Sequence, residues 1–183
     1  GSIPFADEYQ PYVIATDQYV VYPNNDSSNV AVYGYLYSET AALNGTVASS
    51  QIPSGLRGVC PYGWHLPSEG EWQQLINMYD RSIASQQLAG SPELWTRANS
   101  LYVHNANFGA SGFNAVPAGI YTSTGAMNER YQAFGLSGFY WSSTYDEPFE
   151  LKFLNIAYTQ CGLVVDHVFS PYYAYSVRCV RDN

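Results

Sequence analysis

Short runs of β-branched and aromatic residues, separated by turn-forming clusters, recur along the chain and predict short strands. Residues 18–22 (QYVVY) and 29–37 (NVAVYGYLY) are two such runs, and the PNNDSS cluster between them is typical of a turn. These two runs predict a hairpin or two successive strands. In the second half of the chain, residues 112–122 and 138–145 are apolar runs with polar bounds and predict further strands.

Alternation of apolar and polar residues predicts two more strands near the C-terminus. In residues 148–153 (PFELKF) the apolar side chains occupy every second position, so they share one face. Residues 175–179 (YSVRC) alternate in the same way and place Cys179 on the apolar face.

Helix start and stop signals lie in the first half of the chain. Ser38 can cap a short helix over the Ala-rich residues that follow, and Gly45 can end it. Ser68 and Glu71 form an S-x-x-E capping box, which gives Glu71 a structural role. Apolar residues then recur at helical spacing, at Trp72, Leu75, Ile76 and Tyr79.

The order of these elements predicts an α+β fold. A second, weaker helix is expected over residues 82–88, so that strands and a short helix precede a helix pair and many short strands follow it. No repeat, linker or low-complexity segment divides the chain. We therefore expect one domain over residues 1–183, with an irregular lead-in over residues 1–18.

Composition narrows the function classes. The chain has 183 residues, a net charge of −8 and only seven Lys and Arg, so it lacks the basic surface that nucleic acids or anionic membranes require. It also has no apolar run long enough to span a membrane. Tyrosine is abundant, with 18 copies, and its amphipathic ring suits the recognition of polar ligands such as sugars and equally the packing of strands.

The chain has three cysteines, Cys60, Cys161 and Cys179. A bridge between Cys60 and Cys179 would close most of the chain into one loop and stabilise the fold by about 4–5 kcal/mol. Two buried free thiols are the alternative. Cys161 has no cysteine two or three residues away, so we interpret it as a structural thiol.

Metal and cofactor motifs are absent. His65, His104 and His167 are far apart in sequence, and no C-x-x-C or H-E-x-x-H spacing predicts zinc, so His65 is expected to hydrogen-bond inside the fold. Oxygen-rich segments at residues 23–29, 145–150 and 165–168 could offer calcium ligands, but they lack EF-hand spacing and turn chemistry explains them. We expect no cofactor, and calcium has no motif to support it.

Motifs for hydrolysis are absent as well. The GLSGF segment around Ser137 lacks the second glycine of a G-x-S-x-G nucleophile elbow. Asp146 and Glu147 are sequence neighbours, so on a strand they would face opposite ways, which argues against a glycosidase pair.

Four motifs in a fixed order carry a resemblance to a known family: CPYGWHLPSEGEW (60–72), FNAVPAGIY (113–121), YWSSTY (140–145) and YSVRCVRD (175–182). The chain resembles the Fibrobacter succinogenes major paralogous domain family, whose members carry C-P-x-G-W-H-[LV]-P-S-x-x-E-W and S-V-R-C-V-[KR]-D. The resemblance covers residues 33–182, and we expect the family domain over residues 19–182.

The family is similar to C-type-lectin-like domains. The resemblance therefore implies two helices, short twisted antiparallel strands and a long loop region. It implies an exported or surface lipoprotein of the Bacteroidetes type, outside the cell or on the outer-membrane or periplasmic side of a Gram-negative bacterium, with a lipid anchor or flanking domains beyond this sequence. It also implies a Cys60–Cys179 disulfide, no catalytic residues, and core positions for Trp64, His65, Trp72 and Trp141.

Sugar binding through calcium does not carry over. Lectins that use calcium carry an E-P-N or Q-P-D triplet and a W-N-D strand, whereas this chain has YWSST and a single E-P, at Glu147-Pro148. By position, residues 122–138 correspond to the long loop. This loop and a neighbouring rim supply the candidate ligand-binding residues Thr122, Asn128, Glu129, Arg130, Tyr131, Tyr145, Asp146 and Glu147.

We therefore expect a non-catalytic binding module for a glycan or a surface protein. The first alternative is a structural or adhesive part of a surface fibre or assembly. The second is an oxidase similar to the formylglycine-generating enzymes, which share the lectin-like fold and use paired cysteines. That alternative requires Cys161 and Cys179 to be free to bind copper.

Overall fold

A computed structural model describes residues 18–80, 82–96, 103–146, 150–158, 164–169 and 172–182. It combines α-helices with antiparallel sheets, which confirms the α+β class. None of the helices in these ranges is long and apolar enough to cross a membrane.

The described strands form three sheets, in which all neighbouring strands are antiparallel. A five-stranded sheet has the order β1 (Val20–Val21), β2 (Leu36–Ser38), β9 (Tyr173–Tyr175), β4 (Ile120–Thr122) and β5 (Tyr131–Gln132). A three-stranded sheet consists of β6 (Ser137–Tyr145), β7 (Glu150–Ala157) and β8 (Val164–Phe169). The third sheet is the pair β3 (Trp64–His65) and β10 (Val180–Arg181).

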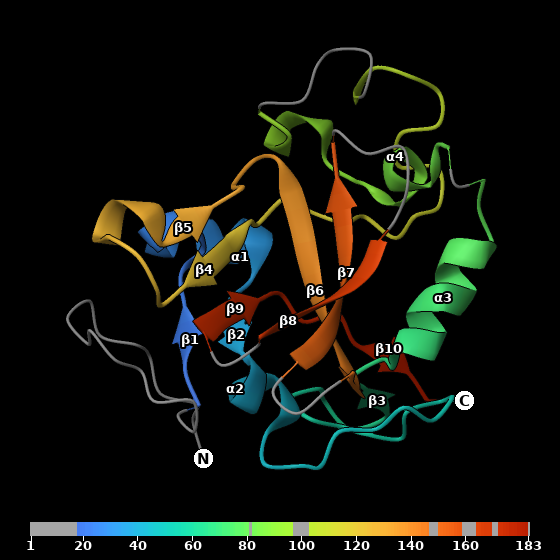
Figure 1. Cartoon of the computed structure of the whole chain (residues 1–183). Coiled ribbons are helices and arrows are strands. Elements are labelled where there is room, and N and C mark those ends of the chain that lie inside the picture. Colours follow the sequence, from blue (N-terminus) through green and yellow to red (C-terminus); the bar gives the residue numbers. More distant parts are fainter. Residues whose placement is uncertain are drawn as a thin grey trace.

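The helices are short. The α-helices are α1 (Val30–Tyr33), α2 (Glu39–Leu43), α3 (Glu69–Asn77) and α4 (Ala84–Leu88). The 3₁₀ helices are η1 (Pro23–Asn25), η2 (Ser27–Asn29), η3 (Pro92–Leu94) and η4 (Met127–Glu129). Figure 1 shows β6 and β7 in the middle of the molecule, the five-stranded sheet on one side of them and α3 on the other, with β3 and β10 near the lower end of α3.

The predicted capping box of α3 is confirmed. Ser68 Oγ accepts from the backbone N–H of Glu71, and Glu71 Oε2 accepts from the backbone N–H of Ser68 at 2.9 Å. These bonds satisfy amide groups that the first turn of a helix leaves unpaired. The helix then buries Trp72 and Ile76 against the core, as their spacing predicts.

The short helix predicted after Ser38 is also confirmed. Ser38 Oγ accepts from the backbone N–H of Ala41, and α2 follows directly. The helix ends at Asn44, which adopts the left-handed conformation just before Gly45. Asparagine tolerates this conformation because its short polar side chain can hydrogen-bond locally.

The strand predicted over residues 29–37 is wrong in its first part, because Val30–Tyr33 form α1. The cause is local. Asp26 accepts from the backbone N–H of Ser28 at 2.8 Å, which starts a helical turn that η2 and α1 extend. Gly34, at φ +75°, then ends α1 before β2 begins. The capped turn outweighs the β propensity of the valines.

The strand predicted over residues 112–122 is present only at its end, as β4. Asn114 and Gly119 have positive φ and Pro117 offers no N–H, so the extended ladder is interrupted. A Cβ on Gly119 would lie 2.4 Å from the carbonyl oxygen of Gln132, so this close approach requires glycine. The strands predicted over residues 138–145 and 148–153 correspond to β6 and β7 within the described residues.

The buried core supports both sides of β6 and β7. One cluster contains Trp72, Trp95 and Leu154 and lies beneath α3 and α4. A second contains Trp141 and Tyr175, whose rings stack at 4.2 Å between centroids. The predicted core positions of Trp72 and Trp141 are therefore confirmed.

Candidate functional site

A disulfide joins Cys60, near the end of the loop before β3, to Cys179, just before β10. It confirms the pairing that the family resemblance implies and removes the alternative of two free thiols. Because the sulfur of Cys179 is bonded to Cys60, it is not a free partner for Cys161, and the oxidase alternative requires that free pair. Cys161 itself lies outside the described residues.

The β3–β10 pair decides which side chains face inward. Val180 lies opposite His65, and Arg181 lies opposite Trp64. Successive side chains of a strand point to opposite faces, so His65 and Trp64 cannot both enter the core. His65 is buried at 3% exposure, whereas Trp64 is 39% exposed. The core position expected for His65 is confirmed, and the one expected for Trp64 is wrong.

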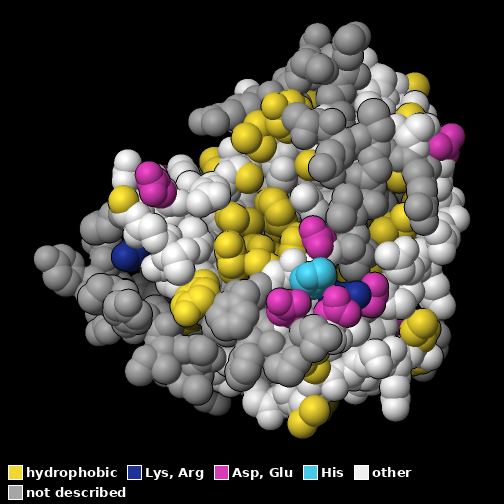
Figure 2. Space-filling view, in the orientation of Figure 1, with side chains coloured by type: hydrophobic (Ala, Val, Ile, Leu, Met, Phe, Trp, Pro, Cys, Tyr) yellow, Lys and Arg dark blue, Asp and Glu magenta, His cyan; other side chains and the backbone are white. Residues whose placement is uncertain are grey.

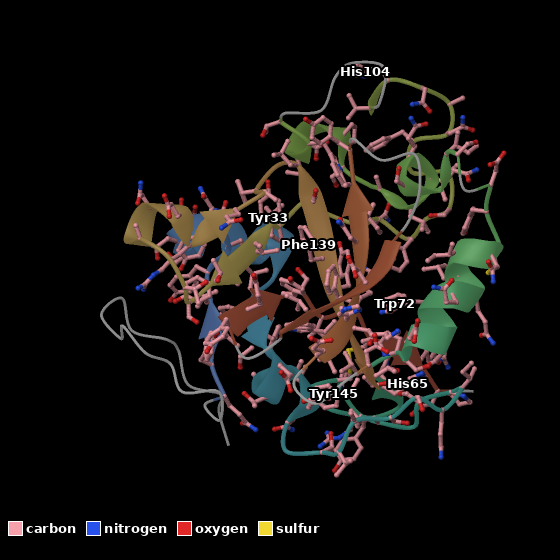
Figure 3. All side chains as sticks on the ribbon, viewed as in Figure 1. Tyr33, His65, Trp72, His104, Phe139 and Tyr145 are labelled. Atoms are coloured by element: carbon pink, nitrogen blue, oxygen red, sulfur yellow. A yellow bond between two sulfur atoms is a disulfide. The ribbon has the colours of Figure 1, made fainter. Side chains whose placement is uncertain are left out.

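His65 lies between two carboxylates. Its Nδ1 is 2.6 Å from Asp182 Oδ1, and its Nε2 is 2.7 Å from Glu71 Oε1. An ionised carboxylate only accepts hydrogen bonds, so while Glu71 and Asp182 are both ionised the two ring nitrogens donate and the ring is an imidazolium. We call these three residues the His65 cluster. Figure 3 labels His65 at the foot of α3, below Trp72.

Glu71 connects the His65 cluster to the surrounding backbone. Its Oε2 accepts from the N–H groups of Ser54, at 3.0 Å, and of Ser68, at 2.9 Å, while its Oε1 faces His65. The carboxylate therefore ties together the loop before β3, the start of α3 and the imidazole. The helix-capping role predicted for Glu71 is correct, and the contacts to Ser54 and His65 are additional.

These contacts shift two pKa values in opposite directions. Burial of the imidazole alone lowers its pKa, but the hydrogen bonds to Asp182 and Glu71 outweigh this effect and raise the pKa of His65 above 6.5. Burial alone raises the pKa of Glu71, but the hydrogen bonds from Ser68, His65 and Ser54 outweigh it and lower that pKa below 4.5. Folding therefore favours the charged form of both groups.

A cleft of about 580 Å³ opens beside this cluster, and we call it the β3–β10 cleft. Besides the His65 cluster, its lining includes Arg57, Tyr62, Trp64, Gln74 and Arg181. The Tyr62 side chain is 89% exposed, and the guanidinium carbon of Arg57 lies 4.7 Å from the centroid of its ring. The cleft thus combines two exposed aromatic rings with two guanidinium groups.

The segment predicted as the long loop, residues 122–138, contains ordered elements. Thr122 is the last residue of β4, and it is 4% exposed. Its hydroxyl hydrogen-bonds with that of Thr124, so Thr122 is not accessible to a ligand, contrary to the prediction. Asn128 and Glu129 are exposed in η4. Tyr131 belongs to β5 and packs on Tyr121 at 5.2 Å between ring centroids.

Arg130, the remaining candidate of this segment, lies directly before β5. It is partly buried, and its Nε has no hydrogen-bond partner in the described structure. The backbone of residues 131–132 pairs with β4 in the sheet, whereas in a free loop it would be unpaired. The prediction of one continuous loop is therefore wrong.

The predicted rim lies elsewhere in the molecule. Gly119, next to β4, bridges to Gly138 at the start of β6, whereas Tyr145 ends β6. Seven residues of extended strand separate these points by about 20 Å. Figures 1 and 3 show β4 and Tyr145 well apart. The structure therefore does not bring the two groups of candidate residues together, and Glu147 lies outside the described residues.

Asp146 belongs to a different group of charges. His167 Nδ1 lies 3.3 Å from Asp146 Oδ2, and His167 Nε2 lies 3.6 Å from Glu150 Oε2. Lys152 Nζ is 3.5 Å from Asp146 Oδ1. We call these four residues the His167 cluster. Figure 2 shows a histidine among acidic side chains at the border of a hydrophobic area on this face.

The His167 cluster unites two of the three segments that the sequence offered as oxygen-rich. One ligand atom from each of Asp146, Glu150 and His167 falls within 4.8 Å of the others, a spacing that could hold a metal ion. The ammonium of Lys152 already supplies a positive charge there. The prediction that no cofactor is bound stays a prediction.

Sequence reasoning missed Arg57, Tyr62 and Arg181 as functional candidates. The available signal was that Trp64 and His65 are neighbours on a strand, where successive side chains point to opposite faces, so only one of the two can be buried. The glycine at position 63 was a second signal, because glycine marks turns, and the structure places it at φ +79° between Tyr62 and Trp64.

Comparison with known proteins identifies a family. A model of the Fibrobacter succinogenes major domain family matches residues 5–181 of the chain. No curated protein and no solved structure matches it.

Proposed function

The chain belongs to the Fibrobacter succinogenes major domain family, and we propose that it is an exported, non-catalytic module that binds saccharides in the β3–β10 cleft. We expected glycan or protein binding at residues 122–131 and 145–147. The cleft supports saccharide binding better, because its aromatic and polar groups line one concave surface.

The observation that carries the proposal is the exposure of Tyr62 and Trp64 together. Tyr62 is 89% exposed and Trp64 is 39% exposed, although burying an aromatic ring is favourable. Exposed aromatic side chains beside polar groups suit a ligand with apolar C–H faces and hydroxyl edges, which describes a sugar ring. Gln74 and Arg181 provide hydrogen-bond donors at the same place.

The Cys60–Cys179 disulfide supports export, because such bonds persist in oxidising compartments. The C-type-lectin-like class is part of the proposal. Its support is the covalent link between the start of the α3 region and the last strand, together with the mixed helices and antiparallel sheets. The proposed binding does not use calcium, because the cleft is defined by aromatic and cationic groups.

Trp64 offers a direct test. The chain has four tryptophans, and the other three are at most 2% exposed, so acrylamide should quench mainly the fluorescence of Trp64. The probes are neutral gluco-, xylo-, manno- and galacto-oligosaccharides and acidic oligomers of galacturonate, mannuronate and sulfated galactose. A bound sugar should protect Trp64 from quenching, and Trp64→Ala should weaken binding of that sugar by about tenfold, as loss of an aromatic contact predicts.

Tyr172→Ala is the matched control, because Tyr172 is an aromatic residue of 40% exposure outside the cleft. It should leave sugar binding unchanged. If no oligosaccharide in the panel protects Trp64, the proposal of a saccharide site is wrong. If Tyr172→Ala weakens binding as much as Trp64→Ala, the site is not the β3–β10 cleft.

A further inference from the structure

We propose that the saccharide bound in the β3–β10 cleft is anionic and carries a carboxylate or sulfate group. This inference rests on the proposed function of the cleft and adds the charge of its ligand. The observations that carry it are the positions of Arg57 and Arg181 and the engagement of the nearby carboxylates.

Positive charge is scarce in this chain, and two of its cationic side chains line the cleft. The chain has seven Lys and Arg against 15 Asp and Glu, and two of the seven, Arg57 and Arg181, line the cleft. Within the described part of the chain, neither guanidinium forms an ion pair with a carboxylate. Neither cation is therefore neutralised by a carboxylate, and among its described contacts the Arg57 guanidinium meets only the neutral ring of Tyr62.

The acidic residues of the cleft are already engaged. Glu71 and Asp182 each face a nitrogen of His65, at 2.7 and 2.6 Å. The imidazolium offsets part of their charge, and Glu71 also accepts two backbone N–H groups. An incoming anion therefore meets two guanidinium groups together with carboxylates that are already paired.

Each exposed aromatic ring has a guanidinium beside it. Arg181 lies opposite Trp64 in the β3–β10 register, and side chains opposite each other in an antiparallel pair are neighbours on one face. Arg57 lies over one face of the Tyr62 ring, at 4.7 Å. A sugar ring that stacks on Trp64 directs its exocyclic acid group sideways, toward Arg181, whereas a sugar on the open face of Tyr62 reaches Arg57 past the edge of the ring. The planar guanidinium matches a carboxylate or sulfate through paired N–H donors.

The net charge of the chain makes this arrangement selective. At −8, the protein repels anions in general, so attraction of an acidic sugar has to come from these two local cations. Exposed charges are screened by salt, so binding of an acidic sugar should weaken as the salt concentration rises, and binding of a neutral sugar should not.

The test compares matched ligands and matched variants of the whole chain. The acidic probes are oligomers of galacturonate, glucuronate, mannuronate and sulfated galactose, each paired with its methyl-esterified or desulfated form. Poly-glutamate serves as an anion without sugar rings. The variants are Arg57→Gln, Arg181→Gln and, as a control, Arg178→Gln, which removes a guanidinium that also stacks on an aromatic ring, Phe113, outside the cleft.

We expect at least one acidic probe to bind about tenfold more tightly than its neutral form, since hydrogen bonds to charged groups are the stronger ones. Arg57→Gln and Arg181→Gln should each remove most of this preference, and Arg178→Gln should retain it. Thermal unfolding of each variant shows whether it is folded, and retained binding of a neutral form shows whether the cleft is intact.

Two results overturn the inference and leave the proposed function standing: neutral forms bind as tightly as acidic ones, or the Arg57 and Arg181 variants keep the full preference. Poly-glutamate binding that survives Trp64→Ala also overturns it, because the site would then recognise a polyanion without its sugar rings. If neither acidic nor neutral probes protect Trp64 from acrylamide, both the inference and the proposed function are wrong.

Discussion

The chain contains two histidines surrounded by carboxylates, and they behave differently because their surroundings differ. His65 is 3% exposed and lies 2.6 and 2.7 Å from its two partners. The side chain of His167 is 46% exposed, and its nearest carboxylates are 3.3 and 3.6 Å away. Similar groups thus form a tight cluster around the buried His65–Glu71 pair at one place, with only Asp182 half exposed, and a loose solvated cluster at the other.

The backbone accounts for much of this difference. Glu71 accepts hydrogen bonds from the backbone N–H groups of Ser54 and Ser68, so the position of its carboxylate is fixed independently of His65. Asp146 has no comparable anchor among the described contacts of its side chain and shares its charge between Lys152 and His167. Ion pairs at exposed positions contribute little to stability, whereas breaking a buried one is costly.

The largest effect should come from the disulfide that holds β10 beside the His65 cluster. Replacing both Cys60 and Cys179 by Ser should lower the free energy of unfolding by about 4–5 kcal/mol, because the bond joins residues 119 positions apart. It should also loosen Asp182 from His65 and leave the His167 cluster in place. Urea unfolding measures the first effect, and NMR titration of the two imidazoles measures the second. An unchanged His65 titration in the folded variant would show that the cluster does not depend on the covalent link.

The next effect should come from Glu71. Glu71→Ala leaves Nε2 of His65 and the N–H groups of Ser54 and Ser68 without their acceptor, so the free energy of unfolding should fall by about 3–5 kcal/mol. Urea unfolding of this variant beside Asp146→Ala, which removes a carboxylate from the exposed cluster, provides the comparison. Equal losses in the two variants would mean that burial does not distinguish the clusters.

A smaller effect should appear in the pH dependence of stability. Folding raises the pKa of His65, so its stabilisation is complete below 6.5 and is lost as the pH rises through its folded-state pKa. Folding lowers the pKa of Glu71, so its stabilisation is present above 4.5 and is lost as the pH falls through its folded-state pKa. The two contributions are therefore greatest together between these limits.

Chemical unfolding of the wild type at pH values from about 5 to 9 should show stability decreasing above 6.5. His65→Gln should reduce this slope, and His167→Gln should retain it. A slope that survives in His65→Gln would assign the pH dependence to another group.

The smallest effect should come from the exposed cluster. His167→Ala should change the free energy of unfolding by less than about 1 kcal/mol, the usual limit for exposed ion pairs. Added salt should reduce even this difference, because it screens exposed charges. A loss in urea unfolding as large as that of Glu71→Ala would show that the His167 cluster contributes as a buried network does.

Local sequence signals predicted the elements whose causes are local. Ser68 and Glu71 are three residues apart, so the capping box of α3 could be read directly, and the alternation around Leu151 predicted the face that β7 buries. The resemblance to the family, which the match over residues 5–181 confirms, supplied the Cys60–Cys179 pairing.

Distant contacts explain what the sequence could not predict. His65 meets Asp182 across 117 positions, and Trp64 meets Arg181 through the register of a two-residue ladder. No local pattern specifies that ladder, so Trp64 was assigned to the core and the cleft was missed. The strand predicted at Val30 failed for the opposite reason, because the turn begun by Asp26 outweighed an apolar run that suited a strand.

The placement of the disulfide also governs how the cleft responds to mechanical load. Trp64 follows Cys60 by four residues, and Arg181 follows Cys179 by two, so the walls of the cleft are joined through a short covalent path. If a tensile force breaks the hydrogen bonds between β3 and β10, the disulfide still prevents the walls from separating. Release of the proposed saccharide under load would then be limited by its own contacts to the cleft rather than by separation of the walls.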